Sequence, residues 1–239
     1  MKATEYIENR IKRLPRGYVF TYKDFVSEVD SKEAVIKCLN RMAAADKIKK
    51  LSKGKYYKPE ETPFGSLNPE QYQIVKDLLE KQGKLIGYIT GLGIYNQLGL
   101  TTQVSNVIQI GRNNFRPPLK RGKYKILFIK QKNIITKESV PLLQILDSIR
   151  YIKKIPDTTI DEACGRIISL IQKLSKEDIN RLIRLAIKYN PATRALLGAI
   201  LETIGKKGSE LGSSLNPITK YKMGISKNVL PTMKNWNIE

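Results

Sequence analysis

Residues 17–58 place two helix signals and a lysine-rich hairpin in a fixed order, and this order restricts the fold more than any other feature of the chain. Asp30 can accept hydrogen bonds from the first free amides of a helix, and Glu33, three residues later, can reach back toward it. A helix is therefore expected to begin near Ser31.

This helix has one apolar face and one polar face. Apolar residues recur at helical spacing at Val35, Leu39 and Met42. The opposite face carries Lys37, Asn40 and Arg41. The second helix of a helix-turn-helix lies in the major groove, so these three side chains are predicted to contact base edges, with Ser31 at the start of the helix.

A basic hairpin follows the helix. Residues 47–52 and 55–58 are two short β-capable runs that flank the turn Ser52-Lys53-Gly54-Lys55. Lys53 and Lys55 are predicted to contact phosphates, which adds affinity but no sequence information. The alternative is a solvated cationic helix followed by an ordinary hairpin.

Two earlier segments complete the predicted three-helix core. Residues 4–14 form an amphipathic pattern that ends before Pro15, and residues 22–29 form a second helix that Thr21 can cap. Thr21 and Tyr22 are candidate phosphate contacts at this helix start, although capping alone would also explain Thr21. Residues 1–59 are therefore predicted to be a winged helix-turn-helix DNA-binding domain.

The rest of the chain divides at residues 59–69, PEETPFGSLNP, which are typical of a linker. Residues 60–137 mix helix and strand patterns and are predicted to form an α+β domain with a basic hairpin. Residues 138–239 are predicted to form a helical bundle followed by a loosely packed tail, in which Leu215, Ile218, Met223 and Trp236 could dock. The expected fold class is α+β.

Charge points to a polyanionic partner. The chain has 43 Lys and Arg against 22 Asp and Glu, a formal net charge of +21, and the excess is present in all three predicted domains. An A+T-rich genome would also raise the lysine content. A second basic patch in the middle domain is predicted to contact flanking phosphates through Arg112, Arg116, Lys120 and Arg121.

Missing residue types exclude several chemistries. The chain has no histidine, two cysteines (Cys38 and Cys164) and no Walker motif, and Gly91-Leu92-Gly93 lacks the third glycine of a dinucleotide fingerprint. We expect no enzyme activity, no catalytic residue, no metal site and no cofactor. Asp147 and Asp157 are expected to be caps or surface residues.

Membrane association is not expected either. The sequence has no signal-peptide pattern and no apolar run of about 18 residues, so a cytoplasmic location is expected.

Three stretches carry a resemblance to a known family: residues 19–59, YITGLGIYNQLGLTTQVSN at residues 88–106, and IPDTT at residues 155–159. Together they resemble the AbiEi-type antitoxins, in particular a branch described only as a domain of unknown function. The residues that carry the winged-helix part of the resemblance are Ser31, Lys37, Asn40, Arg41, Lys53 and Lys55.

The resemblance implies a transcriptional repressor in a type IV toxin-antitoxin system of phage defence. Its N-terminal winged helix would bind inverted repeats of double-stranded DNA in the promoter of its own operon. Its C-terminal part would counteract a cognate nucleotidyltransferase-like toxin. The alternative is a protein- or RNA-interaction module, in which the winged helix only packs against the other domains. In that case Tyr88, Tyr95, Phe115 and Tyr124 could stack on unpaired bases.

Overall fold

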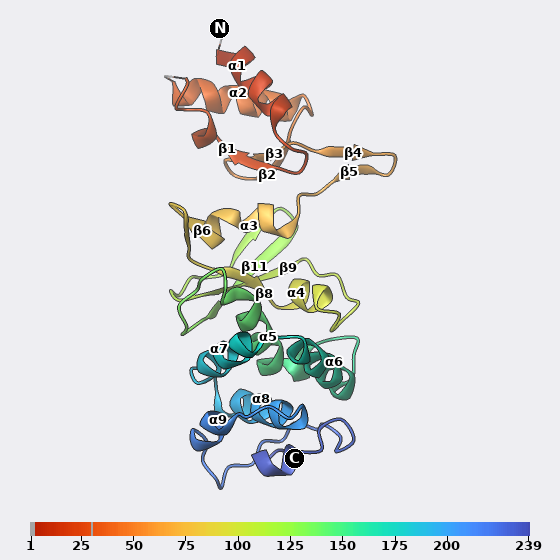
Figure 1. Ribbon diagram of the computed structural model, residues 1–239. Coiled ribbons are helices and arrows are strands. Elements are labelled where there is room, and N and C mark those ends of the chain that lie inside the picture. The colour runs from red at the N-terminus through yellow and green to blue at the C-terminus, as the bar shows by residue number, and fades with distance from the viewer. Residues whose placement is uncertain (1–2, 30) are drawn as a thin grey trace. The chain divides into compact units, whose positions relative to one another are not determined.

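The computed structural model describes residues 3–29 and 31–239 and has helices toward both ends with strands between them (Figure 1). The α+β class predicted from the sequence is confirmed. The chain forms two compact units. The first is Met1–Leu78 together with Lys120–Tyr124, and the second is Leu79–Leu119 together with Lys125–Glu239.

The first unit begins with two helices and a small antiparallel sheet. Its first elements are α1 (Ala3–Arg13), β1 (Val19–Thr21), the 3-10 helix η1 (Tyr22–Asp24), α2 (Lys32–Ala44), β2 (Lys49–Ser52) and β3 (Lys55–Tyr57). The strand order is β1-β3-β2, with Val19 and Lys49 both opposite Tyr57. Ile7, Phe20 and Leu39 form its buried core together with Phe25 and Ile48.

The helix predicted over residues 22–29 is wrong. Only the single 3-10 turn η1 forms there, although Phe25 and Val29 still reach the core. Thr21 caps this turn by accepting a hydrogen bond from the Lys23 amide, while Asp24 accepts from the Thr21 amide. Thr21 and Asp24 form a capping box, which starts this turn but does not determine how far it extends.

Helix α2 begins where it was predicted, near Ser31. The Ser31 side chain is its N-cap, and its Oγ accepts a hydrogen bond from the Ala34 amide at 3.2 Å. Asp30, which was predicted to cap this helix, is outside the described residues.

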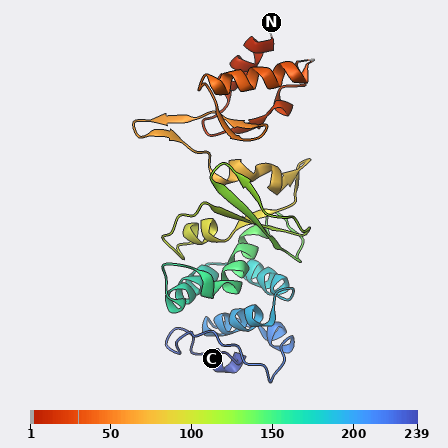
Figure 2. The same ribbon diagram turned by 180° about the vertical axis from the view of Figure 1, so that it is seen from behind.

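The segment predicted as a linker forms a hairpin of its own. Strands β4 (Glu60–Thr62) and β5 (Gly65–Leu67) pair antiparallel, with Glu60 opposite Leu67. The hairpin extends away from the sheet of the first unit, as Figure 1 and Figure 2 show from opposite sides. Helix α3 (Gln71–Leu79) follows it. Whether residues 60–137 form a separate domain stays a prediction.

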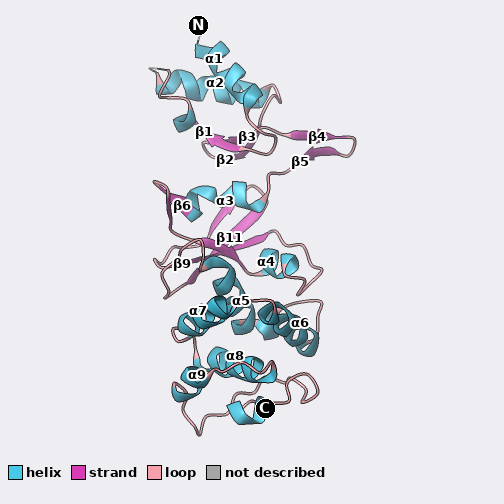
Figure 3. Ribbon diagram, in the orientation of Figure 1, coloured by secondary structure: helices cyan, strands magenta, loops and turns pink. Residues whose placement is uncertain are grey.

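A mixed sheet follows α3 (Figure 3). Its four strands are β8 (Tyr88–Thr90), β9 (Val107–Arg112), β10 (Leu119–Arg121) and β11 (Tyr124–Lys130). The short strands β6 (Glu80–Lys81) and β7 (Lys84–Leu85) pair with each other before it, and helix α4 (Leu92–Gln97) lies between β8 and β9 in the sequence. The strand order is β10-β11-β9-β8. Strands β9 and β11 were predicted to flank a basic hairpin, but they run parallel, with Ile126 opposite Ile108. The hairpin is instead β10 with β11.

Helices complete the second unit. They are α5 (Val140–Arg150), the 3-10 helix η2 (Ile152–Lys154), α6 (Ile160–Gln172), α7 (Lys176–Ala186), α8 (Pro191–Thr203), α9 (Ser209–Ser213) and the 3-10 helix η3 (Met233–Trp236). The spacing of leucine and isoleucine predicts helices over residues 139–149, 160–174, 176–189 and 193–204, with Ser175 at a helix start. The four long helices lie within about three residues of these limits. In the described ranges, no helix is long and apolar enough to cross a membrane.

The tail after Gly205 is packed, contrary to the prediction. Leu230 and Ile238 are buried, and the Trp236 ring rests on Gly198 of α8, where an added Cβ would lie 2.1 Å from it. The Trp236 indole N–H donates to Glu202 at 2.6 Å. Ile218, one of the four predicted docking residues, is exposed.

Asp147 is buried inside the second unit, so its assignment as a cap or surface residue is wrong. The hydroxyls of Tyr88, Thr90 and Tyr189 donate to its carboxylate at 2.7–2.9 Å. Gln131 in turn donates to both tyrosine hydroxyls. Burial raises the pKa of Asp147, and the three donors offset this only in part.

Candidate nucleic-acid interface

Helix α2 presents the cations that the sequence predicted. Val35 and Leu39 are fully buried on one face, whereas Lys37 and Arg41 are exposed on the other. The Arg41 guanidinium makes one long hydrogen bond of 3.4 Å to Thr4. Such a contact is weak, so this side chain can still reach a ligand.

Four other predicted contacts already have partners within the first unit. Asn40 accepts a hydrogen bond from the Tyr56 hydroxyl at 2.7 Å, which leaves its NH₂ group as the donor available to a base. Ser31 and Thr21 use their hydroxyls as caps. The Tyr22 ring faces the Lys32 ammonium, with 5.2 Å between the nitrogen and the ring centroid.

The β2–β3 hairpin separates its two lysines. Lys53 is exposed at the turn, beside Gly54, whose positive φ of 71° favours glycine. Lys55 points elsewhere, because its ammonium forms an ion pair with Asp77 of α3 at 3.0 Å. Lys53 is therefore the lysine of this turn that can meet phosphates.

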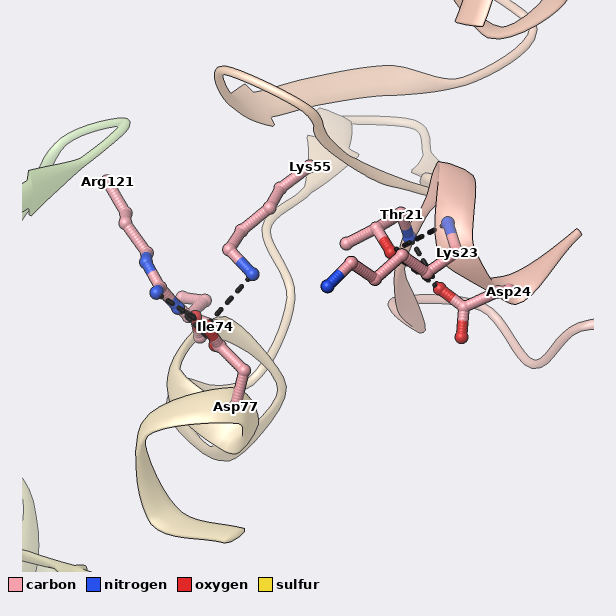
Figure 4. A network of polar contacts seen from close by, with 7 residues as sticks. All are labelled: Thr21, Lys23, Asp24, Lys55, Ile74, Asp77 and Arg121. Atoms are coloured by element: carbon pink, nitrogen blue, oxygen red, sulfur yellow. Dashed lines mark hydrogen bonds and ion pairs between the residues drawn. The ribbon is translucent and has the colours of Figure 1, made fainter. Parts of the chain in front are cut away.

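Asp77 also holds Arg121, which was predicted to bind DNA (Figure 4). The Arg121 guanidinium donates to both carboxylate oxygens, at 2.5 and 2.8 Å, and to the Ile74 carbonyl at 2.6 Å. The arginine side chain is only 7% exposed. Because this fork-to-fork geometry uses both ends of the guanidinium, we remove Arg121, together with Lys55, from the set of candidate phosphate contacts.

The two cations affect the pKa of Asp77. Burial alone would raise its pKa, but the Arg121 hydrogen bonds and charge, followed by the charge of Lys55, outweigh this effect and lower the pKa. Asp77 is the residue that the sequence analysis missed. Asp77 lies on α3, four residues after the half-buried Gln73. Nothing in this local pattern shows that Arg121, 44 residues later, would pair with it.

Arg112 and Arg116 belong to the second unit and share the ring of Phe128. Their guanidinium carbons lie 5.9 and 5.7 Å from its centroid. Among the described residues, the buried Nε and Nη1 of Arg112 have no hydrogen-bond partner. Burial, and then the charge of Arg116, lowers the pKa of Arg112. Buried charges are usually paired, so the free N–H groups of Arg112 are candidate donors to an anion.

The predicted basic patch therefore divides between the two compact units. Arg112 and Arg116 lie in the second unit, while Lys120 and Arg121 belong to the first. Lys120 is exposed. Within residues 3–29 and 31–239, no group of acidic residues and cysteines is arranged to hold a metal ion.

Comparison with known proteins identifies the family. The family model described as "Family of unknown function (DUF6088)" matches residues 6–182. The chain therefore belongs to this family, and the matched range includes both candidate basic surfaces.

The crystal structure of the RV2827C protein from Mycobacterium tuberculosis has a similar fold. The TM-score is 0.59, the sequence identity is 13%, and the alignment covers 94% of this chain and 85% of that one. At this level of identity the likeness concerns the fold alone. No curated protein matches the sequence.

Proposed function

We propose that this protein is a DNA-binding repressor of its own operon and the antitoxin of a toxin-antitoxin pair. In this proposal the first unit is a winged helix, α2 is the recognition helix and the β2–β3 hairpin is the wing. The order of helix, strand, short turn, helix and hairpin in this unit supports that assignment. Helix α1 and the η1 turn would take the places of the other helices in the three-helix core.

The observation that carries the DNA-binding proposal is the two-sided character of α2. A helix packed through Val35 and Leu39 leaves Lys37 and Arg41 free on the opposite face. Arginine can contact guanine in a bidentate way, and lysine neutralises phosphates. Neither these two cations nor Lys53 at the hairpin turn takes part in any ion pair of the described residues.

Arg41→Ala is expected to weaken binding to the upstream region of the gene roughly tenfold, about 1.4 kcal/mol, with relaxed preference at one base pair. The side chain is exposed, so the melting temperature should change little. Fluorescence anisotropy with the upstream duplex and with a random duplex of equal length measures both affinity and preference.

The matched control is Arg184→Ala. Arg184 is an exposed arginine in the last turn of α7, in the second unit, so this variant loses the same charge away from the proposed surface. Equal losses of duplex affinity in the two variants would show that the net charge of the protein, and not the α2 surface, explains the effect. If the wild-type protein binds the upstream and random duplexes equally well, specific repression is excluded.

The antitoxin part of the proposal rests on the resemblance to AbiEi-type antitoxins. Co-expression with the product of the neighbouring gene tests it, with growth and co-purification scored together. Wild-type protein and Arg41→Ala should both protect, since the substitution affects operator binding alone. If neither protects, the chain is not the antitoxin of that gene product.

A second candidate function is favoured by one observation in the second unit. Phe115 is 90% exposed and lies in the sequence between Arg112, whose Nε and Nη1 have no hydrogen-bond partner among the described residues, and Arg116. An exposed aromatic ring in a basic loop is a feature that can bind unpaired bases of RNA.

Phe115→Ala separates the two candidate functions. If the protein is an RNA-interaction module, this substitution should weaken single-stranded RNA binding by about 1–3 kcal/mol, the usual contribution of one stacked base. Binding to duplex DNA should stay the same. Affinities for duplex DNA, single-stranded RNA and tRNA at one salt concentration provide the comparison, and a preference for duplex DNA that Phe115→Ala leaves intact counts against the RNA function.

A further inference from the structure

A cavity of about 360 Å³ lies within the second unit, and none of its lining residues belongs to either candidate nucleic-acid surface. Its walls come from the end of α5 with η2, from the first turn of α8, and from the segment of residues 220–223. Ligand sites commonly have volumes of about 300–1,000 Å³. The cavity therefore has room for a small organic molecule.

Cations surround this cavity. Arg150, Lys153, Lys154, Lys220 and Lys222 line it, and among the described residues no acidic side chain does. Glu239 lines an adjoining hollow and neutralises one of these cations, Lys220, through an ion pair of 2.5 Å. The other four form no ion pair within residues 3–29 and 31–239.

The first turn of α8 adds a further positive contribution. This helix of 13 residues begins at Pro191, and Ala192 and Thr193 of its first turn line the cavity. The N-terminus of a helix carries a partial positive charge and favours anions.

Two buried hydroxyl groups belong to the same lining. Thr193 is 1% exposed and Tyr221 is 8% exposed, and both residues line the cavity. Among the described residues, neither hydroxyl has a hydrogen-bond partner. A buried hydroxyl without a partner is unfavourable, and such groups in native proteins commonly have a functional reason.

The backbone holds both residues in place. The Thr193 amide donates to the Asn190 side chain at 2.8 Å, which caps α8. The Tyr221 amide donates to the Asn237 carbonyl at 2.7 Å, and its carbonyl accepts from the Glu239 amide at 2.9 Å. The backbones of the two residues are therefore anchored, and both residues are buried.

We propose that this cavity binds a small organic phosphate. The four cations that form no ion pair and the positive end of α8 neutralise the phosphate group, and the Thr193 and Tyr221 hydroxyls, which are covered in the free protein, donate to its oxygens as the ligand enters. Ile149, Ile152 and Met223 line the rest of the cavity and pack against the organic part. This goes beyond DNA binding and would give the protein a ligand-responsive site outside its DNA-binding unit.

Isothermal titration calorimetry on the full-length protein tests the proposal, with adenosine 5′-monophosphate, inorganic phosphate and adenosine as probes. We expect the monophosphate to bind at one site, inorganic phosphate to compete with it, and adenosine to bind far more weakly. The variants Thr193→Val and Tyr221→Phe each remove only a hydroxyl. Each should weaken monophosphate binding roughly tenfold, about 1.4 kcal/mol.

The same two variants distinguish a ligand site from a structural role. Because neither hydroxyl is partnered in the free protein, their removal should leave the melting temperature unchanged or higher. Lys154→Gln should also weaken binding, whereas Lys207→Gln, a matched change at an exposed lysine outside the cavity, should not.

Three results would overturn the proposal. One is the absence of binding for both the monophosphate and inorganic phosphate. Another is monophosphate binding that all three cavity variants leave intact. The third is a loss of duplex DNA affinity in Lys154→Gln as large as its loss of monophosphate affinity, since these cations would then belong to a nucleic-acid surface. Failure of operator binding alone leaves this proposal standing.

Discussion

Replacing Asp77 with Ala is expected to lower the free energy of unfolding of the first unit by about 3 kcal/mol. The substitution leaves Arg121 buried without its carboxylate, and breaking a buried pair typically costs about 3–5 kcal/mol. Asp77 is itself 42% exposed, so water can partly replace it and the lower end of that range applies. Amide hydrogen exchange in β1, β3 and α3 measures the loss within this unit.

Two controls make the Asp77 result interpretable. Glu8→Ala removes the partner of an exposed pair with Lys47 in the same unit and should cost less than about 1 kcal/mol. The double substitution Asp77→Ala with Arg121→Met removes both charges and should recover much of the stability, because no buried charge remains. A loss in Asp77→Ala no larger than in Glu8→Ala would show that the Asp77–Arg121 pair contributes little.

The same carboxylate predicts how stability changes with pH. Its pKa is lower in the folded protein than in an unfolded chain, so its stabilising contribution is complete above the unfolded value of about 4. The contribution is lost as the pH falls through the lower, folded pKa. Asp77→Ala should therefore differ most from the wild-type protein near neutral pH and converge with it in acid.

Gly111→Ala is expected to destabilise the second unit by about 3 kcal/mol. Gly111 of β9 is opposite Tyr88 of β8, and a Cβ at Gly111 would lie 2.5 Å from the Tyr88 ring. The ring cannot move freely, because its hydroxyl is hydrogen-bonded to Asp147 and Gln131. Overpacking costs about 1–3 kcal/mol and a lost hydrogen bond to a buried charge adds a similar amount.

Trp236 provides the measurement, since it is the single tryptophan of the chain and lies in the second unit. Urea unfolding followed by its fluorescence should show the loss. Gly165→Ala is the matched control. Nothing lies within 4 Å of a Cβ at Gly165, inside α6, so this substitution should raise stability by about 0.5–1 kcal/mol. Equal stability of the two variants would exclude the Tyr88 contact as a constraint.

Helix positions were predictable because their signals are local. The apolar spacing of α2 and α5–α8 is contained in about a dozen residues each, and the limits follow from caps such as Ser31 and Ser175. The failures have non-local causes. The parallel pairing of β9 with β11, the packing of Trp236 on Gly198 and the burial of Asp147 all depend on residues far away in the sequence.

The candidate site was predictable to the extent that charge and helical face determine it. Lys37, Arg41 and Lys53 are exposed as expected. A count of cations could not show which of them have internal partners, and this is why Lys55 and Arg121 were assigned to DNA. The burial of Asp147 did have one local signal. It lies between Leu146 and Ser148 in an apolar helix, one turn after Leu143, and therefore on the same face as that leucine.

Because Lys120–Tyr124 belongs to the first unit, that unit cannot be completed until the ribosome has also translated residues 79–119. Asp77 and Arg121 are 44 residues apart, and at about 5–20 residues per second a ribosome needs roughly 2 to 9 s to make the chain between them. Throughout that interval the Asp77 carboxylate lacks its main cation. A stalled nascent chain that exposes residues up to 119 should therefore be cut by protease within its first 78 residues, and one that exposes residue 130 should be protected. The first unit therefore completes this ion pair only after residues 79–119, which belong to the second unit, have been translated.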